Sequence, residues 1–168
     1  MRVIASIVVA LVLSSSASFA SLLPVAVQLP FSMRQPEECR HTATEFNCVE
    51  FIYNYDGDTI NVRVPDVHPL IGEKISVRVA GVDTPELVSD DPCERGVARV
   101  SRNFVRSMLS SASRIDLNDL RRDKYFRILA DVTADGESVS QALLVHGLAL
   151  PYDGGAKVRV DWCERAQQ

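Results

Sequence analysis

The order of two hydrophobic periods along the chain constrains its fold more than any other feature. Apolar and polar residues alternate over 48–55, 59–64 and 74–82, which is the two-residue period of a half-buried strand. Over 94–111 the apolar residues instead recur every three or four positions, and Asp91 precedes this run as a candidate N-cap. Three strands followed by one amphipathic helix are therefore predicted.

Two more strands and a second helix follow. The segments 114–119 and 126–134 are typical of strands, and 138–147 has Ser138 and Gln141 at the spacing of a helix capping box. The order β-β-β-α-β-β-α predicts an α+β fold. It is a five-stranded OB-fold β-barrel with a helix between strands three and four and a second helix after strand five.

The first residues have the layout of a secretory signal peptide. A basic residue at position 2 precedes an apolar run over 3–13, and small residues follow up to Ala20, after which cleavage is expected. A membrane anchor is the alternative, but this run is too short to span about 30 Å of hydrocarbon. We expect a signal peptide at 1–20, an irregular leader at 21–47 and one OB-fold domain at 48–168. The mature protein is expected to be secreted or periplasmic, without stable membrane association.

The cysteines that remain after this cleavage are Cys39, Cys48, Cys93 and Cys163. An even number behind a secretory signal favours disulfides. Three pairings are possible, and the nearness of Cys39 to Cys48 suggests one short loop, with Cys93 and Cys163 closing a long one. A zinc site is the alternative, but the chain has no C-x-x-C or H-x-x-x-H spacing.

The charge balance argues against a general attraction to polyanions. Without residues 1–20 the chain keeps 17 basic and 22 acidic side chains, a net charge of −5. Affinity for nucleic acid would have to come from a few local arginines or from a bound cation. Lys157 and Arg159 are expected to be solvated surface cations.

The stretch DGDT, residues 56–59, places two carboxylates at a predicted hairpin turn that needs only one turn former. On a regular strand Asp56 and Asp58 would leave the same face, so that one could bind a cation while the other supports it. The alternative is that Asp-Gly is simply a common hairpin dipeptide.

A second group of oxygen donors lies in the stretch DTPE. Pro85 favours an extended Thr84, whose carbonyl would face outward beside the Asp83 carboxylate. With Asp58 these oxygens form a hard site that suits Ca²⁺ better than Zn²⁺ or a strictly octahedral Mg²⁺. Glu86 could act as general base on a water held by the metal. The alternative is an ordinary helix start with Thr84 as its cap.

Arg78 and Arg127 are the candidates for a phosphate clamp. Two guanidiniums can bind a phosphate through paired hydrogen bonds and neutralise the charge that develops as it reacts. Arg78 precedes Asp83 by five residues, so a bulge or turn at Gly81 is needed to bring the two side chains together. The alternative is that both arginines form surface ion pairs.

Four motifs resemble the staphylococcal nuclease family over about residues 49–152. They are DGDT, then R-x-x-x-x-D-T-P-E from Arg78 to Glu86, then DKYFR ending at Arg127, and finally SVSQALLVHGLALPYDGG. Each is weak alone, and all four in order are specific. The resemblance implies a five-stranded OB barrel and Ca²⁺-dependent hydrolysis of DNA and RNA with little sequence preference, leaving 3′-phosphate ends.

The resemblance also implies a role for each matching residue. The Ca²⁺ site would consist of the Asp58 and Asp83 carboxylates and the Thr84 backbone carbonyl, with Asp56 in support. Glu86 would be the general base, and Arg78 and Arg127 would form the phosphate clamp. Lys124 and Tyr125 would contact the nucleotide's terminal phosphate.

The chain departs from the family pattern in several places. Phe126 stands where glycine is common, and its ring could alter how Arg127 reaches the site. The net charge is negative where the type member is basic, so weaker and more salt-sensitive substrate binding is expected. The type member's long C-terminal helix has no counterpart, and a Cys93–Cys163 bridge is expected to fasten this part of the chain instead.

Three functions are compatible with these residues. The first is a monomeric, calcium-dependent nuclease acting on DNA and RNA. The second is a non-catalytic OB-fold module that binds nucleic acid or protein, and the third is a disulfide-linked extracellular interaction domain. Degenerate binding modules usually lose the acids or the arginines, whereas this chain keeps them all, so the nuclease is predicted.

Overall fold

The computed structural model describes residues 39–165. All of them belong to the second of the two units into which the chain divides, Ser32–Gln168, and the fold below is that of this unit alone. The predicted signal peptide at 1–20 and most of the predicted leader lie outside the described residues. Among those described, no helix combines the length and the apolar character needed to cross a membrane.

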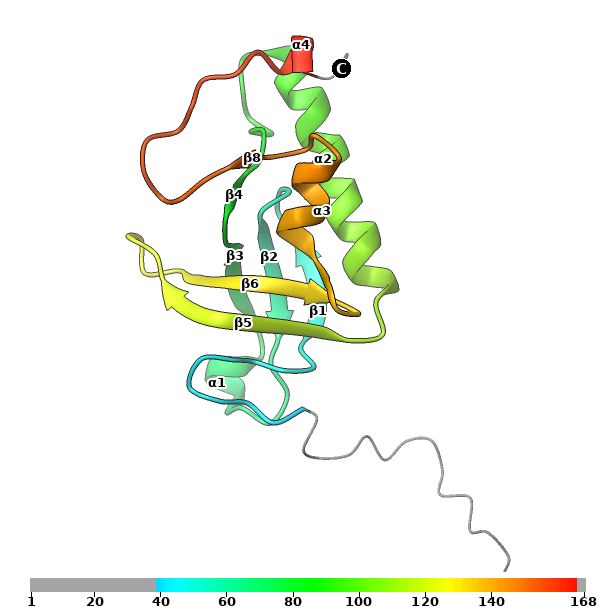
Figure 1. The fold of residues 1–168 in the computed structure, drawn as a ribbon. Helices are drawn as coiled ribbons and strands as arrows, with labels where there is room; N and C mark the ends of the chain where they lie inside the picture. The colour runs from blue at the N-terminus through cyan, green and yellow to red at the C-terminus, as the bar shows by residue number, and fades with distance from the viewer. Residues whose placement is uncertain (1–38, 166–168) are drawn as a thin grey trace, which may run out of the picture. The chain divides into compact units, whose positions relative to one another are not determined.

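Strands and helices follow the predicted order, with several short elements added (Figure 1). The strands are β1 (Glu50–Asn54), β2 (Thr59–Arg63), β3 (Ile75–Val79), β4 (Val82–Asp83), β5 (Ile115–Arg122), β6 (Ile128–Ala134), β7 (Glu137–Ser138) and β8 (Leu150–Pro151). The helices are α1 (Pro69–Gly72), α2 (Pro92–Ser111), α3 (Val139–Val145) and α4 (Trp162–Arg165).

The five long strands form one mixed sheet in the order β1-β2-β3-β6-β5, with β7 paired to β6. All its pairs are antiparallel except β3 with β6, which is parallel. Figure 1 shows β5 and β6 running across β1, β2 and β3 at a steep angle. The chain just before β1 also bonds to β5, through a Phe46–Leu117 bridge and a Val49 to Ile115 hydrogen bond of 2.9 Å. The outer strands are thereby linked, and the predicted α+β OB-fold is confirmed.

Helix α2 covers this sheet with one apolar face. Its N-cap Asp91, as predicted, accepts a hydrogen bond from the Cys93 N–H, and Pro92 occupies the first turn. Ala98, Val105 and Leu109 recur at helical spacing and are buried against the strands. The core on which they pack is rich in valine, isoleucine and leucine, which suits strands buried on one face.

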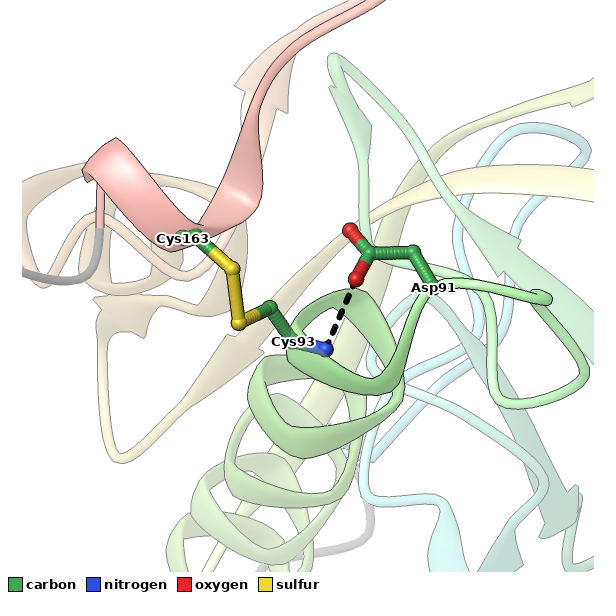
Figure 2. A group of neighbouring side chains, drawn as sticks. All are labelled: Asp91, Cys93 and Cys163. Atoms are coloured by element: carbon green, nitrogen blue, oxygen red, sulfur yellow. Dashed lines mark hydrogen bonds between the residues drawn. A yellow bond between two sulfur atoms is a disulfide. The ribbon is translucent and has the colours of Figure 1, made fainter.

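Two disulfides are present in the described chain, the short-range Cys39–Cys48 and the long-range Cys93–Cys163. This is the suggested pairing, and it is confirmed. The second bridge fastens α4 to the start of α2 (Figure 2). Asp91 lies beside the two sulfurs, but because both sulfurs are bonded to each other and Asp91 caps the helix, this group serves structure rather than metal binding.

The sequence patterns missed only short elements. The connection between β2 and β3, where no helix was predicted, contains α1, whose N-cap His68 accepts a hydrogen bond from the Leu70 N–H. The predicted third strand ends at Val79, and β4 leaves the main sheet to pair with β8. An ordinary helix start at Thr84 is wrong, because no helix begins before Pro92 in that stretch.

Removing the long-range disulfide should destabilise this fold more than removing the short one. Serine at Cys93 and Cys163 should lower the free energy of unfolding by about 4 kcal/mol, since the bridge closes 70 residues. Serine at Cys39 and Cys48, 9 residues apart, should cost about 2–3 kcal/mol. Urea denaturation of the two double variants measures both losses. A larger loss for the short loop would contradict the chain-entropy account.

Candidate active site

The DGDT stretch forms the connection between β1 and β2. Asp56 accepts hydrogen bonds at Oδ1 from the N–H groups of Asp58 and Thr59, at 3.1 and 2.7 Å, so its carboxylate shapes the turn. The amide of Asn54 donates to the Asp56 carbonyl and to the Arg102 carbonyl on α2, which ties the turn to that helix. Burial raises the pKa of Asp56, and the hydrogen bond from Thr59 opposes this only in part.

Gly57 is required here by space and not by backbone conformation. Its φ is not among the positive values found in the described chain. A Cβ at this position would overlap the Oγ of Ser101 on α2 and lie 2.7 Å from Cγ2 of Thr84. Helix α2 and the DTPE stretch therefore both pack closely against the turn that carries Asp58.

A second turn brings Asp83 beside Arg78. Gly81 has a φ of +80° and reverses the chain between β3 and β4, a left-handed conformation that glycine adopts without strain. Arg78 Nη2 then lies 3.1 Å from the Val82 carbonyl and 3.3 Å from Asp83 Oδ1. The realignment predicted at Gly81 is confirmed.

The two turns meet at the carboxylate of Asp58, which is 5% exposed. Its Oδ2 accepts from both the N–H and the hydroxyl of Thr84, each at 2.8 Å. Its Oδ1 forms an ion pair with Nη1 of Arg78. One carboxylate therefore joins β2, β3 and the DTPE stretch.

Arg78 is itself buried and stays charged. Burial lowers the pKa of its guanidinium, while the charges of Asp83 and Asp56 act to raise it. Because an arginine starts far above neutrality, the side chain remains a cation at neutral pH. Arg78 holds Asp58 and Asp83 side by side through ion pairs with both. A guanidinium that only clamped a phosphate would not make these pairs.

Glu86 follows Asp83 and is about half exposed, at 52% of its side chain. Its partner is Lys157, which was expected to be a solvated surface cation. The ammonium of Lys157 lies 2.6 Å from Glu86 Oε1 and 3.0 Å from Asp83 Oδ1. Desolvation would lower the pKa of Lys157, but the hydrogen bonds to these two carboxylates outweigh it and raise the pKa. Lys157 follows Glu86 by 71 positions, and no motif in the sequence links it to Glu86 or Asp83.

Arg127 comes from the tip of the β5–β6 hairpin. Its Nε donates to Asp123 Oδ2 at 2.7 Å and its N–H donates to Asp123 Oδ1 at 2.9 Å. Desolvation would raise the pKa of Asp123, but these bonds outweigh it and lower the pKa. The guanidinium also lies over the Tyr125 ring, 5.5 Å from its centroid. Arg127 is thus held by its Nε edge.

Phe126 sits at the same tip with a φ of +62°. This left-handed conformation favours glycine, which is the residue that the family resemblance leads us to expect at this position. The Phe126 ring is 79% exposed and is not among the residues that line the cavity described next. The ring does not plug the site.

All nine residues predicted to act in the site line one cavity of about 1050 Å³: Asp56, Asp58, Arg78, Asp83, Thr84, Glu86, Lys124, Tyr125 and Arg127. Tyr152 and Lys157, from the chain after β8, line it as well. The structure therefore brings every candidate to one place. Their individual roles stay predictions.

The chemistry of the donors fits a hard divalent cation. Asp58, Asp83 and the Thr84 carbonyl offer only oxygen, and among residues 39–165 no hydrogen bond to that carbonyl is found. Around them, Asp58, Asp83 and Glu86 form ion pairs with Arg78 and Lys157, and the charge of Asp56 also acts on Arg78. Such a group of carboxylates attracts a divalent ion.

Comparison with known proteins places the chain in one family. The staphylococcal nuclease homologue model matches residues 76–163, which include both Arg78 and Glu86 as well as the DKYFR hairpin. The chain belongs to the staphylococcal nuclease family.

Three curated relatives resemble the chain over 56% of its length. Endonuclease YncB of Bacillus subtilis (strain 168) is 38% identical over 97 residues, and the SPbeta prophage-derived endonuclease YokF of the same organism is 36% identical over 97 residues. Thermonuclease of Staphylococcus intermedius is 33% identical over 95 residues. The matches span 43%, 30% and 53% of these proteins, respectively.

The packing of α2 on the DGDT turn predicts a strong effect of one methyl group. Gly57→Ala should lower the free energy of unfolding by about 1–3 kcal/mol because the new Cβ overpacks the contact. Adding Ser101→Ala should restore part of this loss, since the removed Oγ has no hydrogen-bond partner within residues 39–165. Urea denaturation of the single and double variants gives both values.

Gly96→Ala on α2 is the matched control. A Cβ there meets nothing within 4 Å, so the variant should be unchanged or more stable by up to about 1 kcal/mol. Equal losses at Gly57 and Gly96 would show that the close contact with Ser101 is not what destabilises the fold.

Proposed function

We propose that this protein is a calcium-dependent phosphodiesterase that hydrolyses DNA and RNA with little sequence preference and leaves 3′-phosphate ends. The observation that carries the proposal is the cavity in which paired acids, an exposed carboxylate and two arginines from three distant stretches converge. The relatives are named as two endonucleases and a thermonuclease, which agrees with this class of reaction.

Asp58, Asp83 and the Thr84 carbonyl are the residues that would hold Ca²⁺, with Asp56 supporting the turn behind Asp58. A bound Ca²⁺ would supply Lewis-acid polarisation of a phosphate and a local positive charge. The chain's own contribution is rigidity. Because Asp58 is tied to Thr84 and Arg78, the acids are held together before any ligand arrives.

Glu86 is the residue proposed to take a proton from the attacking water. Its carboxylate is exposed on the cavity wall, and its backbone N–H donates to Glu94 Oε1 at 3.1 Å, which fixes the loop that carries it. A carboxylate that can leave its lysine partner has the freedom that a general base needs. As water attacks phosphorus in line, the bond to the 5′ oxygen breaks and that oxygen takes up a proton.

Arg78 and Arg127 are proposed to donate hydrogen bonds to the phosphoryl oxygens as negative charge builds on them. Arg127 is suited to this because Asp123 holds its Nε edge and leaves the outer guanidinium nitrogens to other partners. Lys124 and Tyr125, on the same hairpin, would contact a terminal phosphate of the nucleotide. These groups bind the backbone, which is why little sequence preference is proposed.

The proposed location is outside the cytoplasm, in the periplasm or the medium. Two disulfides in a chain of this size support an oxidising compartment. We propose a domain that acts as a monomer on nucleic acid without a stable membrane contact.

A digestion assay tests the proposed activity. Purified protein should degrade single-stranded and double-stranded DNA in Ca²⁺ and stop when a chelator is added. Glu86→Gln should cut turnover by about two to four orders of magnitude, as loss of a general base does, while nucleotide still binds. Glu137→Gln, an exposed change on β7 outside the cavity, is the control. Intact DNA at every Ca²⁺ concentration, with folded protein, would favour the non-catalytic binding module.

The clamp role of Arg127 predicts a sharp difference between arginine and lysine. Arg127→Lys should lower kcat by at least about tenfold because one ammonium cannot replace a planar fork, while the backbone bond to Asp123 keeps the hairpin folded. Arg63→Lys is the control, since Arg63 pairs with Glu50 outside the cavity. Steady-state kinetics on DNA compare the two, and wild-type turnover in Arg127→Lys would remove Arg127 from the clamp.

A further inference from the structure

Lys157 places its ammonium between two carboxylates that have separate roles in the proposed function. It lies 3.0 Å from Asp83, a proposed metal ligand, and 2.6 Å from Glu86, the proposed base. Asp83 Oδ1 is the oxygen involved, and Arg78 Nη2 reaches the same atom at 3.3 Å. Both contacts of Lys157 are with groups that a reaction would need free.

The chain on either side of Lys157 is anchored, so this contact is built into the fold. At one end the N–H of Tyr152 donates to the Gly81 carbonyl, in the turn that positions Asp83. At the other end α4 is joined to α2 by the Cys93–Cys163 disulfide. Figure 1 shows this segment as a long excursion between β8 and α4. The lysine is therefore carried to the cavity by a segment held at both ends.

The cations around the acids differ in how readily they can leave. Arg78 is buried and bonds to the backbone of Val82 as well as to both aspartates, so its removal would leave several buried acceptors unpaired. Lys157 is 51% exposed, and its ammonium can be rehydrated when it departs. Of these two, Lys157 is the cation that an incoming ion can displace.

We propose that Lys157 competes with a divalent cation for the Asp83 carboxylate and thereby lowers the protein's affinity for Ca²⁺. Binding of the ion then requires the ammonium to leave Asp83, and by linkage it releases Lys157 to solvent. This inference rests on the proposed function for the identity of the metal ligands. It adds Lys157 as a residue that sets the Ca²⁺ concentration at which the site fills.

Isothermal titration of Ca²⁺ into the intact, disulfide-bonded protein tests the competition without any activity assay. Lys157→Met removes the charge and keeps the length of the side chain. Because the lost cation is half-exposed, its removal predicts about 3- to 10-fold tighter binding of Ca²⁺. Arg159→Met removes one charge from the same segment, and within residues 39–165 no ion pair involves Arg159, so its affinity should change less than about twofold.

Chemical labelling gives a second measurement that does not depend on a variant. Reductive methylation of wild-type lysines, followed by mass spectrometry, should show Lys157 reacting faster in saturating Ca²⁺ than in chelator. Lys74, which lies over the Tyr53 ring away from the cavity, should react at the same rate in both.

Equal Ca²⁺ affinity in Lys157→Met and wild type, weaker binding in the variant, or no Ca²⁺ binding in either would each overturn the competition. The outcomes separate it from the proposed function. Tighter binding in Lys157→Met with no digestion of DNA would support the competition and refute the nuclease. Calcium-dependent digestion with unchanged affinity would do the reverse.

Discussion

The buried carboxylate of Asp58 is the interaction on which the site depends. It lies immediately before β2, and it bonds to a turn 26 residues away through two donors of Thr84 and to β3 through Arg78. A buried carboxylate is costly unless such partners satisfy it. Because these partners are also the neighbours of Asp83, satisfying Asp58 brings the second acid into place. Fold stability and site assembly thus share the same contacts.

The cavity combines acidic side chains around Asp58 with a cationic side chain on a separate hairpin. Asp58, Asp83 and Glu86 pair with Arg78 and Lys157, whereas Arg127 pairs through its Nε with Asp123 on a separate hairpin. A chain with a net negative charge can therefore still present a local site for a cation and a phosphate together. The disulfide that anchors α4 extends this arrangement, because it fixes the segment from which Lys157 reaches the acids.

Much of the fold could be predicted because its signals are local. Strand alternation, the N-caps at Asp91 and Ser138 and the turn at Gly81 all depend on residues close in sequence, and each is found as predicted. The short β4 and β8 could not be predicted, since two residues carry no period and their pairing joins distant stretches. The reason for Gly57 was also hidden, because it depends on Ser101 across the core.

The sequence by itself determined the fold class, the family resemblance and the identities of the candidate acids and arginines, because these follow from period, spacing and residue chemistry. The tertiary structure alone decided which groups touch. It set Arg78 against the acids, left the Phe126 ring outside the cavity and carried Lys157 to Asp83 and Glu86. Such contacts join residues up to 74 positions apart, and no local pattern encodes a distance across a folded chain.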